Sequence, residues 1–560
     1  ADVNDVLSNN VQTRFGIRDI TTYINEEDWR GYRVNGRNIL IRGGAWMTSD
    51  MLLNLEDSRY DALVRYAREA NLNMLRSEGF SIRETGTFYD LCDRYGIMAT
   101  QQLFGRNLPD EALAIACIED TLLRIRNHPS LVHLLGHDET FPTETLDQAY
   151  RNLIEKHRIR RSYQPHSGTF NIATRAKTGG TRTGTRELWT YAGPSHYFWT
   201  KQRKFDSAWG FAQSGGIGGI LAARDSLRQM MPEAALWPIE ENETWSFHTV
   251  LQGSTYFNAV YKALERGYGK AAGFEDFCDK LYAMNYNSAR GMFEAYARHK
   301  YKALGITTWK YNAAWPAALT WQYVDWYKRA TAAYYGAKKA CMPLHALYAH
   351  DDQGLYVVNS YYEPRAGLTL YHAVYGLDGQ KHLEEEHPVS VDADGCTRVT
   401  SFEAPDAAGD PYFLRLELRN TDGVPESINT YWLSRIPDIP GKSGETPEDI
   451  FYTEPKSVAD FSALNLLPEA VLDAVPSWEK EILSLELRNT SPTIAFQVEL
   501  ALADPETGLE MAPVYWSDNF ITLFPGEKRL VTAETAEADK KPVLRVRGFN
   551  VVETLVRAEN

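Results

Sequence analysis

Cysteine is scarce in this sequence, with five residues among 560, and no two of them stand close together. A disulfide framework or a zinc site usually shows itself through CxxC pairs, or through Cys and His residues at ligand spacing. Because the sequence contains neither pattern, we expect no disulfide framework, no bound metal and no other cofactor.

Long apolar runs are missing as well. No stretch reaches the roughly 18 residues that a membrane-spanning helix needs, so we expect no membrane partner. The first residues, ADVNDVLSNN, lack the basic and apolar regions of a signal peptide. The localisation is open on this basis, and we favour the periplasm or the exterior of the cell over the cytoplasm.

Positive charge is in deficit, with 59 Lys and Arg against 74 Asp and Glu and a formal net charge of −15. Nucleic-acid binding requires a basic face, so we exclude nucleic acid as a partner. A negative field would steer a cationic substrate inward, although the same charge also serves solubility. Aromatic residues reach 12%, and their rings either stack on sugars or pack in cores.

The pattern of apolar and polar residues changes along the chain. From about residue 35 to residue 340, apolar runs of strand length alternate with helical stretches, which favours a closed parallel barrel. After Pro343, alternating apolar and polar residues with regular turn signals predict β-sandwiches. The linker IPDIPGKSGETPED separates two such sandwiches.

We therefore predict an α/β plus all-β protein, a (β/α)8 TIM barrel followed by two immunoglobulin-like β-sandwich domains. The barrel is predicted over residues 21–342, the first sandwich over 343–440, and the linker with the second sandwich over 441–560. Residues 1–20 contain VQTRFGIRDI, which we interpret as the last strand of a preceding β-sandwich. A single strand needs a sheet, so we expect the chain to begin within a longer enzyme.

Candidate site residues follow from the barrel, because reactive side chains lie at the carboxyl ends of barrel strands. Four predicted strand ends carry suitable residues, which are Trp46 and Asp50, Arg76 and Glu78, Asp138 and Glu139, and Trp309, Asn312 and Trp315. Glycoside hydrolysis needs one carboxyl group to protonate the leaving oxygen and another to attack the anomeric carbon or activate water. Such strand ends also carry structural carboxylates, so the pattern alone leaves both roles open.

Several motifs resemble those of a known family. FGIRD followed by VNGRNILIRGGAWMTSD is similar to the start of the barrel in family 2 glycoside hydrolases, and NMLRSEGF and RNHPSLVHLLGHDETFP resemble their second and fourth strands. AAYYGAKKACMPLHALYAHD is similar to the barrel-to-sandwich junction of exo-β-D-glucosaminidases, and VYWSDNFITLFPGEKRLVTAE and VRGFN to their last domain. The chain is identified as a member of the exo-β-D-glucosaminidase and β-mannosidase branch of this family (clan A).

The resemblance implies a retaining mechanism, with two carboxyl groups about 5–5.5 Å apart. Most members carry Asn-Glu at the end of the fourth strand, where this chain has His137-Asp138. The glucosaminidase branch also uses Asp there, so Asp138 is the implied acid/base, with Glu139 as a competitor. His137 stands where Asn contacts the sugar 2-substituent, and it either contacts the sugar or packs within the barrel.

The nucleophile position departs from the family pattern. Related enzymes carry Phe-Asn-x-Glu, whereas AWGFAQSGGIGG places Ser214 where Glu is expected. An unactivated serine hydroxyl is a poor nucleophile, so we expect weak hydrolysis or none. We favour an engineered replacement, made to trap ligands or to form a glycosynthase. The alternative is a natural departure, with activity lost or with a carboxylate supplied from Glu240, Glu241 or Glu243.

The identity of the sugar depends on two further motifs. Glu78 follows Arg76 at the spacing of the glucosaminidase branch, where a carboxylate would pair with a 2-ammonium group. Asp50 would supply a second carboxylate, although its GGAWMTSD loop is equally similar to that of the mannosidases. The loop from 167 to 197 carries Arg175, Arg182 and Arg186, which would favour an acidic or hydroxyl-rich ligand instead.

The resulting prediction is an O-glycoside hydrolase of carbohydrate metabolism, a retaining and exo-acting β-glycosidase most similar to exo-β-D-glucosaminidases and substituted at its nucleophile. The alternatives are a β-mannosidase, a β-glycosidase for a decorated sugar, or a carbohydrate-binding pseudoenzyme. The expected partners are an oligosaccharide or glycoside and an N-terminal β-sandwich polypeptide of the same enzyme. The linkage, the oligomeric state, and whether that N-terminal half is a separate chain or was removed are left open.

Overall fold

The chain forms two compact units in the computed structural model, residues 1–39 with 76–183 and residues 40–75 with 184–560. Strand β7 (Met74–Ser77) contains one of the boundaries between them. The structure describes residues 2–3, 6–7, 15–25, 30–105, 110–138, 140–166, 186–188, 211–215, 222–249, 253–319, 322–436, 438–439 and 456–557.

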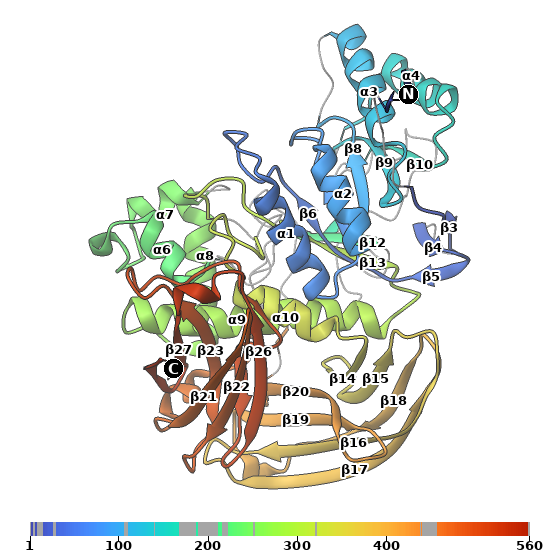
Figure 1. Ribbon diagram of the computed structural model, residues 1–560. Helices are drawn as coiled ribbons and strands as arrows, with labels where there is room; N and C mark the ends of the chain where they lie inside the picture. Colours follow the sequence, from blue (N-terminus) through green and yellow to red (C-terminus); the bar gives the residue numbers. More distant parts are fainter. Residues whose placement is uncertain are drawn as a thin grey trace. The chain divides into compact units, whose positions relative to one another are not determined.

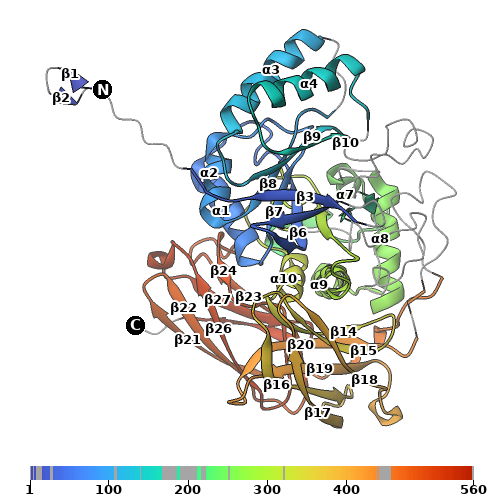
Figure 2. The same ribbon diagram turned by 90° about the vertical axis from the view of Figure 1, so that its right-hand side faces the viewer.

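The first unit is built on three parallel strands, with β9 between β8 and β10. Their bounds, and those of the helices that follow β7, β8 and β9, are β8 (Met98–Gln102), β9 (Leu131–His137), β10 (Ser162–His166), α2 (Gly86–Tyr95), α3 (Glu111–Ile125) and α4 (Glu144–Lys156). Every residue of β9 is buried, as expected for a parallel strand covered on both faces. Helices α3 and α4 lie side by side (Figure 2).

The helices of this unit begin where the sequence supplies capping side chains. Thr85, Asp110 and Thr143 each accept a hydrogen bond from a backbone N–H in the first turn of α2, α3 and α4. These N–H groups have no partner within the helix, so a side-chain acceptor at this position stabilises the helix start. The three helix starts are therefore decided locally by the sequence.

The N-terminal residues form short antiparallel pairs. β1 (Asp2–Val3) pairs with β2 (Val6–Leu7), and β4 (Arg30–Val34) lies between β3 (Ile20–Ile24) and β5 (Arg37–Ile39). The motif FGIRDI predicted a strand from residue 15, but residues 15–19 are not in a strand and β3 begins at Ile20. The assignment of residues 1–20 to a preceding sandwich stays a prediction.

The second unit contains four parallel strands in the order β6-β13-β12-β11. They are β6 (Ile41–Trp46), β13 (Gly305–Trp309), β12 (Phe211–Gly215) and β11 (Arg186–Leu188), and the helices are α1 (Asp57–Glu69), α6 (Arg224–Met230), α7 (Glu243–His248), α8 (Gly253–Tyr268), α9 (Phe274–Arg298) and α10 (Ala332–Ala340). Together with the first unit they confirm an α/β part. Among the described helices, none is long and apolar enough to cross a membrane.

The second unit also contains two β-sandwiches (Figure 1). One is made of a three-stranded and a four-stranded sheet, and the other of two four-stranded sheets. The first consists of β14 (Leu344–Ala349), β15 (Gly354–Asn359) and β18 (Cys396–Ser401) against β17 (Lys381–Val391), β16 (Arg365–Tyr375), β19 (Tyr412–Arg419) and β20 (Pro425–Leu433). The second consists of β21 (Leu472–Glu479), β22 (Ile482–Asn489), β26 (Lys528–Glu534) and β24 (Tyr515–Trp516) against β25 (Ile521–Leu523), β23 (Ala495–Ala503), β27 (Val543–Gly548) and β28 (Val551–Val556).

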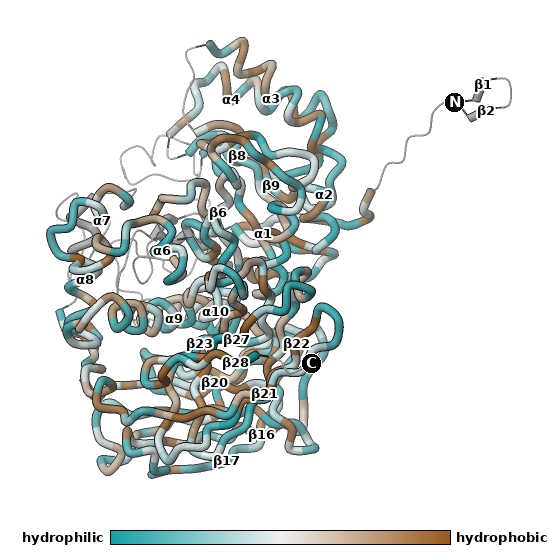
Figure 3. Tube along the Cα trace, turned by 60° about the vertical axis from the view of Figure 1, so that its left-hand side comes forward, coloured by the Kyte–Doolittle hydropathy of each residue, from teal (hydrophilic) through white to brown (hydrophobic). Residues whose placement is uncertain are grey.

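The alternating pattern of the sequence is the physical basis of these sandwiches. In β22, Leu483, Leu485 and Leu487 are buried while the residues between them are more exposed. Because successive side chains of a strand point to opposite faces, this alternation directs one face to the core. Apolar segments recur along the strands of both sandwiches (Figure 3).

Helix α9 is joined to the first sandwich by buried polar side chains. Glu294 accepts hydrogen bonds from Asn429 Nδ2 at 2.9 Å and Tyr431 Oη at 2.7 Å, and lies 2.8 Å from His345 Nε2. Arg290, one turn earlier, donates to Asn429 Oδ1 at 2.9 Å and lies 4.0 Å from the ring centroid of Tyr431. Glu294 is completely buried, so each of these partners replaces a water molecule.

We expect Glu294→Leu to destabilise the protein by about 3 kcal/mol or more, because buried donors left without an acceptor cost about 1–3 kcal/mol each. Urea unfolding measures the change. Glu469→Leu is the matched control, since Glu469 is exposed, and it should change stability by less than about 0.5 kcal/mol. Equal effects of the two substitutions would contradict the importance of this network.

Candidate functional site

Arg76 is the centre of a buried ion cluster in the first unit. Its side chain donates through Nη1 to Glu78 and reaches Asp138 Oδ1 through Nη2 at 3.4 Å. Arg76, Glu78 and Asp138 are only 2%, 4% and 8% exposed. One guanidinium therefore holds two carboxylates, one from the residues after β7 and one from the end of β9. The structure brings these three predicted site residues together.

The backbone around this cluster is held by close contacts. Gly79 N–H donates to Gln102 Oε1 at 2.9 Å, and a Cβ at Gly79 would lie 2.5 Å from the carbonyl oxygen of Phe104. Only glycine fits such an approach without movement of the backbone. Asp138 N–H donates to the carbonyl of Gly105 at 3.1 Å. The segments that carry Glu78 and Asp138 are thus fixed against the residues that follow β8.

Gln102 is a positioning residue that the sequence analysis did not select. It is fully buried, and its bond to Gly79 fixes the residue next to Glu78. Its neighbour Gln101 accepts a hydrogen bond from Tyr89 Oη at 2.5 Å. The sequence did contain a signal for Gln102, since Gln101 and Gln102 are two polar residues at the end of an otherwise apolar predicted strand.

His137 is completely buried within the first unit. Its Nε2 lies 3.3 Å from the hydroxyl of Tyr150, and the two rings meet edge to face. This arrangement is that of a packed core histidine, and a contact with a sugar stays a prediction. Glu139 lies outside the described residues.

The second unit contains another group of predicted site residues. Asn312 exchanges two hydrogen bonds of 3.0 Å with the backbone of Met47, which lies between Trp46 and Asp50. Asp50 is buried and accepts a hydrogen bond from Leu52 N–H at 2.8 Å. Trp315 is 38% exposed and follows Ala314, whose carbonyl accepts from Met51 N–H. The loops after β6 and β13 are therefore bonded together.

Trp46 packs inside the second unit. Its ring stacks on Tyr60 and Tyr311, at centroid distances of 5.9 Å and 6.4 Å, and it has no exposed surface. The structure thus gives this ring a packing function, and its use as a platform for a sugar stays a prediction.

Ser214 lies in β12, where it pairs with Leu188 of β11 and Thr308 of β13. Trp309 is the last residue of β13. The side chains of both residues are outside the described part of the chain. Asp138 belongs to the first unit and Ser214 to the second, so their separation stays a prediction.

The remaining candidates divide between exposed and undescribed positions. Glu240, Glu241 and Glu243 are exposed, and Glu243 lies in the first turn of α7, where a carboxylate favours the helix dipole. Arg175 and Arg182 lie outside the described residues, and only the backbone of Arg186 is described, in β11.

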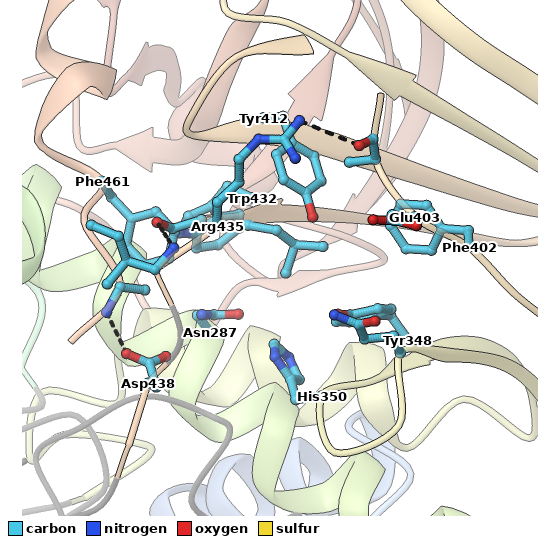
Figure 4. Close-up of a pocket in the computed structure, with 16 residues that line it drawn as sticks. Asn287, Tyr348, His350, Phe402, Glu403, Tyr412, Trp432, Arg435, Asp438 and Phe461 are labelled. Atoms are coloured by element: carbon cyan, nitrogen blue, oxygen red, sulfur yellow. Dashed lines mark hydrogen bonds between the residues drawn. The ribbon is translucent and has the colours of Figure 1, made fainter. Parts of the chain in front are cut away.

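A cavity of about 250 Å³ lies between α9, the first sandwich and the segment before β21. In Figure 4 the rings of Tyr348, Phe402 and Tyr412 lie on one side and Asp438 on the other, with Asn287 between them. Asp438 accepts a hydrogen bond from Ala459 N–H at 2.6 Å. Burial raises the pKa of Asp438 to about 7. Aromatic walls with a few polar groups are typical of a small-molecule pocket.

Comparison with known proteins finds matches to two segments of the chain and to the chain as a whole. Residues 450–551 match the exo-β-D-glucosaminidase Ig-fold domain, and residues 353–436 match the mannosidase Ig/CBM-like domain. The chain is 30% identical over 593 residues to the exo-β-D-glucosaminidase of Streptomyces avermitilis, covering 100% of this chain and 64% of that protein. It is 28% identical over 594 residues to the exo-β-D-glucosaminidase of Amycolatopsis orientalis, covering 100% of this chain and 56% of that protein.

A solved structure agrees with these matches. The crystal structure of the Amycolatopsis orientalis exo-chitosanase superimposes with a TM-score of 0.88 at 27% identity, over 98% of this chain and 67% of that chain. The α/β part, the two immunoglobulin-like sandwiches that follow it in the chain, and these matches together place the chain among the glycoside hydrolases. Within that class, the chain belongs to the exo-β-D-glucosaminidase and β-mannosidase branch of family 2.

We expect Arg76→Met to cost about 3–5 kcal/mol of stability, because it leaves two buried carboxylates without their cation. The double variant Arg76→Met, Glu78→Gln should lose less than Arg76→Met alone, since one of those charges is removed. Denaturant unfolding measures the free energy of unfolding of these two variants and of Glu78→Gln alone, and the three values are compared with that of the unchanged chain. A loss below about 1 kcal/mol for Arg76→Met would show that the cluster is not a buried ion network.

Proposed function

We propose that this chain carries the barrel and sandwiches of a retaining, exo-acting β-glycosidase for β-D-glucosaminides, with Ser214 at the nucleophile position. The observation that carries the proposal is the buried cluster of Arg76, Glu78 and Asp138. The relatives are named exo-β-D-glucosaminidases, and a single-residue variant of the Amycolatopsis orientalis exo-chitosanase was solved in complex with PNP-β-D-glucosamine.

In the proposed mechanism, Asp138 protonates the oxygen of the leaving group. The guanidinium of Arg76 positions Asp138 and Glu78 relative to each other. An ionised carboxylate accepts about four hydrogen bonds, so Arg76 need not be the only donor to Glu78. Glu78 would also bind the 2-ammonium group of glucosamine, since charge-assisted hydrogen bonds are the stronger ones.

The covalent step requires a carboxylate opposite Asp138. The proposal therefore includes closure of the parallel strands of both units into one (β/α)8 barrel, with position 214 facing Asp138. A glutamate at position 214 would then bring two carboxyl groups to the retaining separation of about 5–5.5 Å. A serine leaves the binding surface and the acid in place without the nucleophile, as in a protein made to trap its ligand.

The proposed partner is an N-terminal β-sandwich polypeptide of the same enzyme. The chain spans 64% and 56% of the two bacterial relatives that it matches. Phe15 and Ile17 lie just before β3 and are 73% and 92% exposed. Exposed apolar side chains next to a strand favour cover by another sheet.

We expect Ser214→Glu to create β-glycosidase activity on glucosaminides, because a carboxylate at the anomeric carbon allows the covalent intermediate. Losing or gaining that group changes the rate by several powers of ten, and each factor of ten corresponds to about 1.4 kcal/mol. Rates on aryl glucosaminides, mannosides, glucosides, galactosides and glucuronides measure the outcome. Ser214→Ala is the matched control and should stay inert.

Adding Asp138→Ala to Ser214→Glu separates the proposed role of the acid from that of the nucleophile. The loss should be smaller for aryl glycosides with good leaving groups than for natural disaccharides, because the acid assists only departure of the leaving oxygen. If Ser214→Glu is inert on all five sugar classes, the glycosidase proposal fails and the binding function below takes its place. Ordinary hydrolysis by the unchanged chain would instead mean that the nucleophile lies elsewhere.

The cavity of Figure 4 favours carbohydrate binding as a second candidate function. Most of its lining residues belong to the segment that matches a mannosidase Ig/CBM-like domain. Aromatic rings stack on the apolar faces of sugars, and Asp438 would pair with an ammonium group. Such binding needs no nucleophile.

The pKa of Asp438, about 7, makes this second candidate testable by pH. Between pH 5.5 and pH 7, ionised Asp438 should rise from about 3% to about half. Glucosamine oligomers with trimethylated nitrogens keep their positive charge at every pH, so calorimetry should show them binding several-fold more tightly at pH 7. Asp438→Asn should remove this pH dependence, whereas Asp460→Asn, an exposed site on the same segment, should retain it. Equal affinity at both pH values would contradict this function of the pocket.

A further inference from the structure

His372, Glu385 and His387 meet on one face of a sheet in the first sandwich. Antiparallel pairing sets His372 of β16 directly opposite Glu385 of β17, and these strands lie side by side (Figure 1). His387 is two residues beyond Glu385 on the same strand, so it points to the same face. The ligand atoms of the three side chains all lie within 4.8 Å of one another.

The distances between these atoms fit a metal ion. Glu385 Oε2 lies 3.2 Å from His387 Nε2 and 3.8 Å from His372 Nε2. In a tetrahedral site with bonds of about 2.0–2.1 Å, neighbouring ligand atoms are about 3.3 Å apart. The two imidazole rings are nearly parallel, with an interplanar angle of 9° and a centroid distance of 5.3 Å. Only small side-chain movements would therefore bring all three ligand atoms to bonding distance.

His372 supplies an independent reason to expect a ligand. Its side chain has no exposed surface, and neither of its ring nitrogens has a hydrogen-bond partner among the residues that the structure describes. A buried polar group without a partner is rare in native proteins and requires an explanation. The ring of Phe402 lies beside it, at a centroid distance of 5.9 Å, and offers no acceptor.

A second cluster of possible metal ligands differs from this one, because its histidine has a hydrogen-bond partner. His128 lies near Asp90 and Asp93, and these three side chains are also close enough to surround an ion. However, His128 Nδ1 is hydrogen-bonded to Asp93 at 2.8 Å, and the other oxygen of Asp93 accepts from Ser130 N–H. The histidine of that cluster already has a protein partner, so nothing there requires a metal.

We propose that His372, Glu385 and His387 bind one divalent transition-metal ion of the zinc type. Two imidazoles and one carboxylate suit Zn²⁺, Co²⁺ and Ni²⁺, and three protein ligands leave a further position for water. The side chains of Glu385 and His387 are 50% and 27% exposed, so an ion can enter from solvent. The ion bridges β16 and the edge strand β17 and stabilises the folded state.

The sequence analysis predicted no metal because it searched for local ligand spacing. His372 and Glu385 are brought together only by the pairing of two strands. The proposed ion is independent of the glycosidase proposal, since its ligands belong to the first sandwich.

Titration of the complete, chelator-treated chain with ZnCl₂ in a calorimeter tests the proposal. We expect one Zn²⁺ per chain, a higher melting temperature with Zn²⁺ present, and an absorption spectrum of four-coordinate Co²⁺ when CoCl₂ replaces ZnCl₂. His387→Gln should weaken Zn²⁺ binding at least 100-fold, and it should keep the fold because His387 is partly exposed. His372→Leu, which suits the apolar surroundings, should have the same effect on binding.

Two matched controls assign the ion to this cluster. His382→Gln changes another histidine of β17, and His128→Gln changes the second cluster. Both variants should bind Zn²⁺ as the unchanged chain does. The proposal is overturned if Zn²⁺ does not bind at millimolar concentration, or if neither His387→Gln nor His372→Leu weakens its binding.

Discussion

A guanidinium group removed from water must be surrounded by acceptors, and this constraint organises both units. Arg76 is 2% exposed and holds the two carboxylates of the candidate active site. In the second unit, Arg224 is equally buried and reaches Asp279 of α9 at 2.7 Å and Glu499 of β23 at 3.4 Å. Since an unpaired buried charge is very costly, each such arginine fixes the elements that supply its partners.

Helix α9 shows that the same constraint also shapes the cavity beside the first sandwich. Arg290 bonds to β20 and lies 4.0 Å from the ring centroid of Tyr431 and 5.3 Å from that of Trp432. Trp432 also lines the cavity of Figure 4, as does Asn287, one turn before Arg290. The contact that docks the helix on the sandwich therefore also shapes the pocket wall. Stability and potential binding are properties of the same side chains.

The candidate active site separates two functions that glycoside hydrolysis normally combines. In the proposed mechanism, binding and acid assistance depend on buried, mutually fixed side chains, which are Arg76, Glu78 and Asp138. In the same proposal, nucleophilic attack depends on one carboxylate at position 214, where the sequence has serine. A protein can keep the first set for its structural value as a buried ion network while the second is replaced.

Much of the organisation of this protein was determined by the sequence alone. The alternation of apolar and polar residues predicted the sandwich strands, as in β22. Polar residues at strand ends selected Arg76, Glu78 and Asp138, which the structure places in one buried cluster. Threonine and aspartate caps fixed where helices of the first unit begin. These features are local, because they depend on residues a few positions apart.

Other features were decided only by tertiary structure. Trp46 was predicted to contact a sugar, and only the structure showed that its ring stacks on Tyr60 and Tyr311. The strand expected in FGIRDI begins only at Ile20, where β4 supplies its partner. The cluster of His372, Glu385 and His387 depends on the register of two strands, which periodicity does not specify. A sequence pattern reports which face of an element is apolar, whereas packing decides which side chains meet across it.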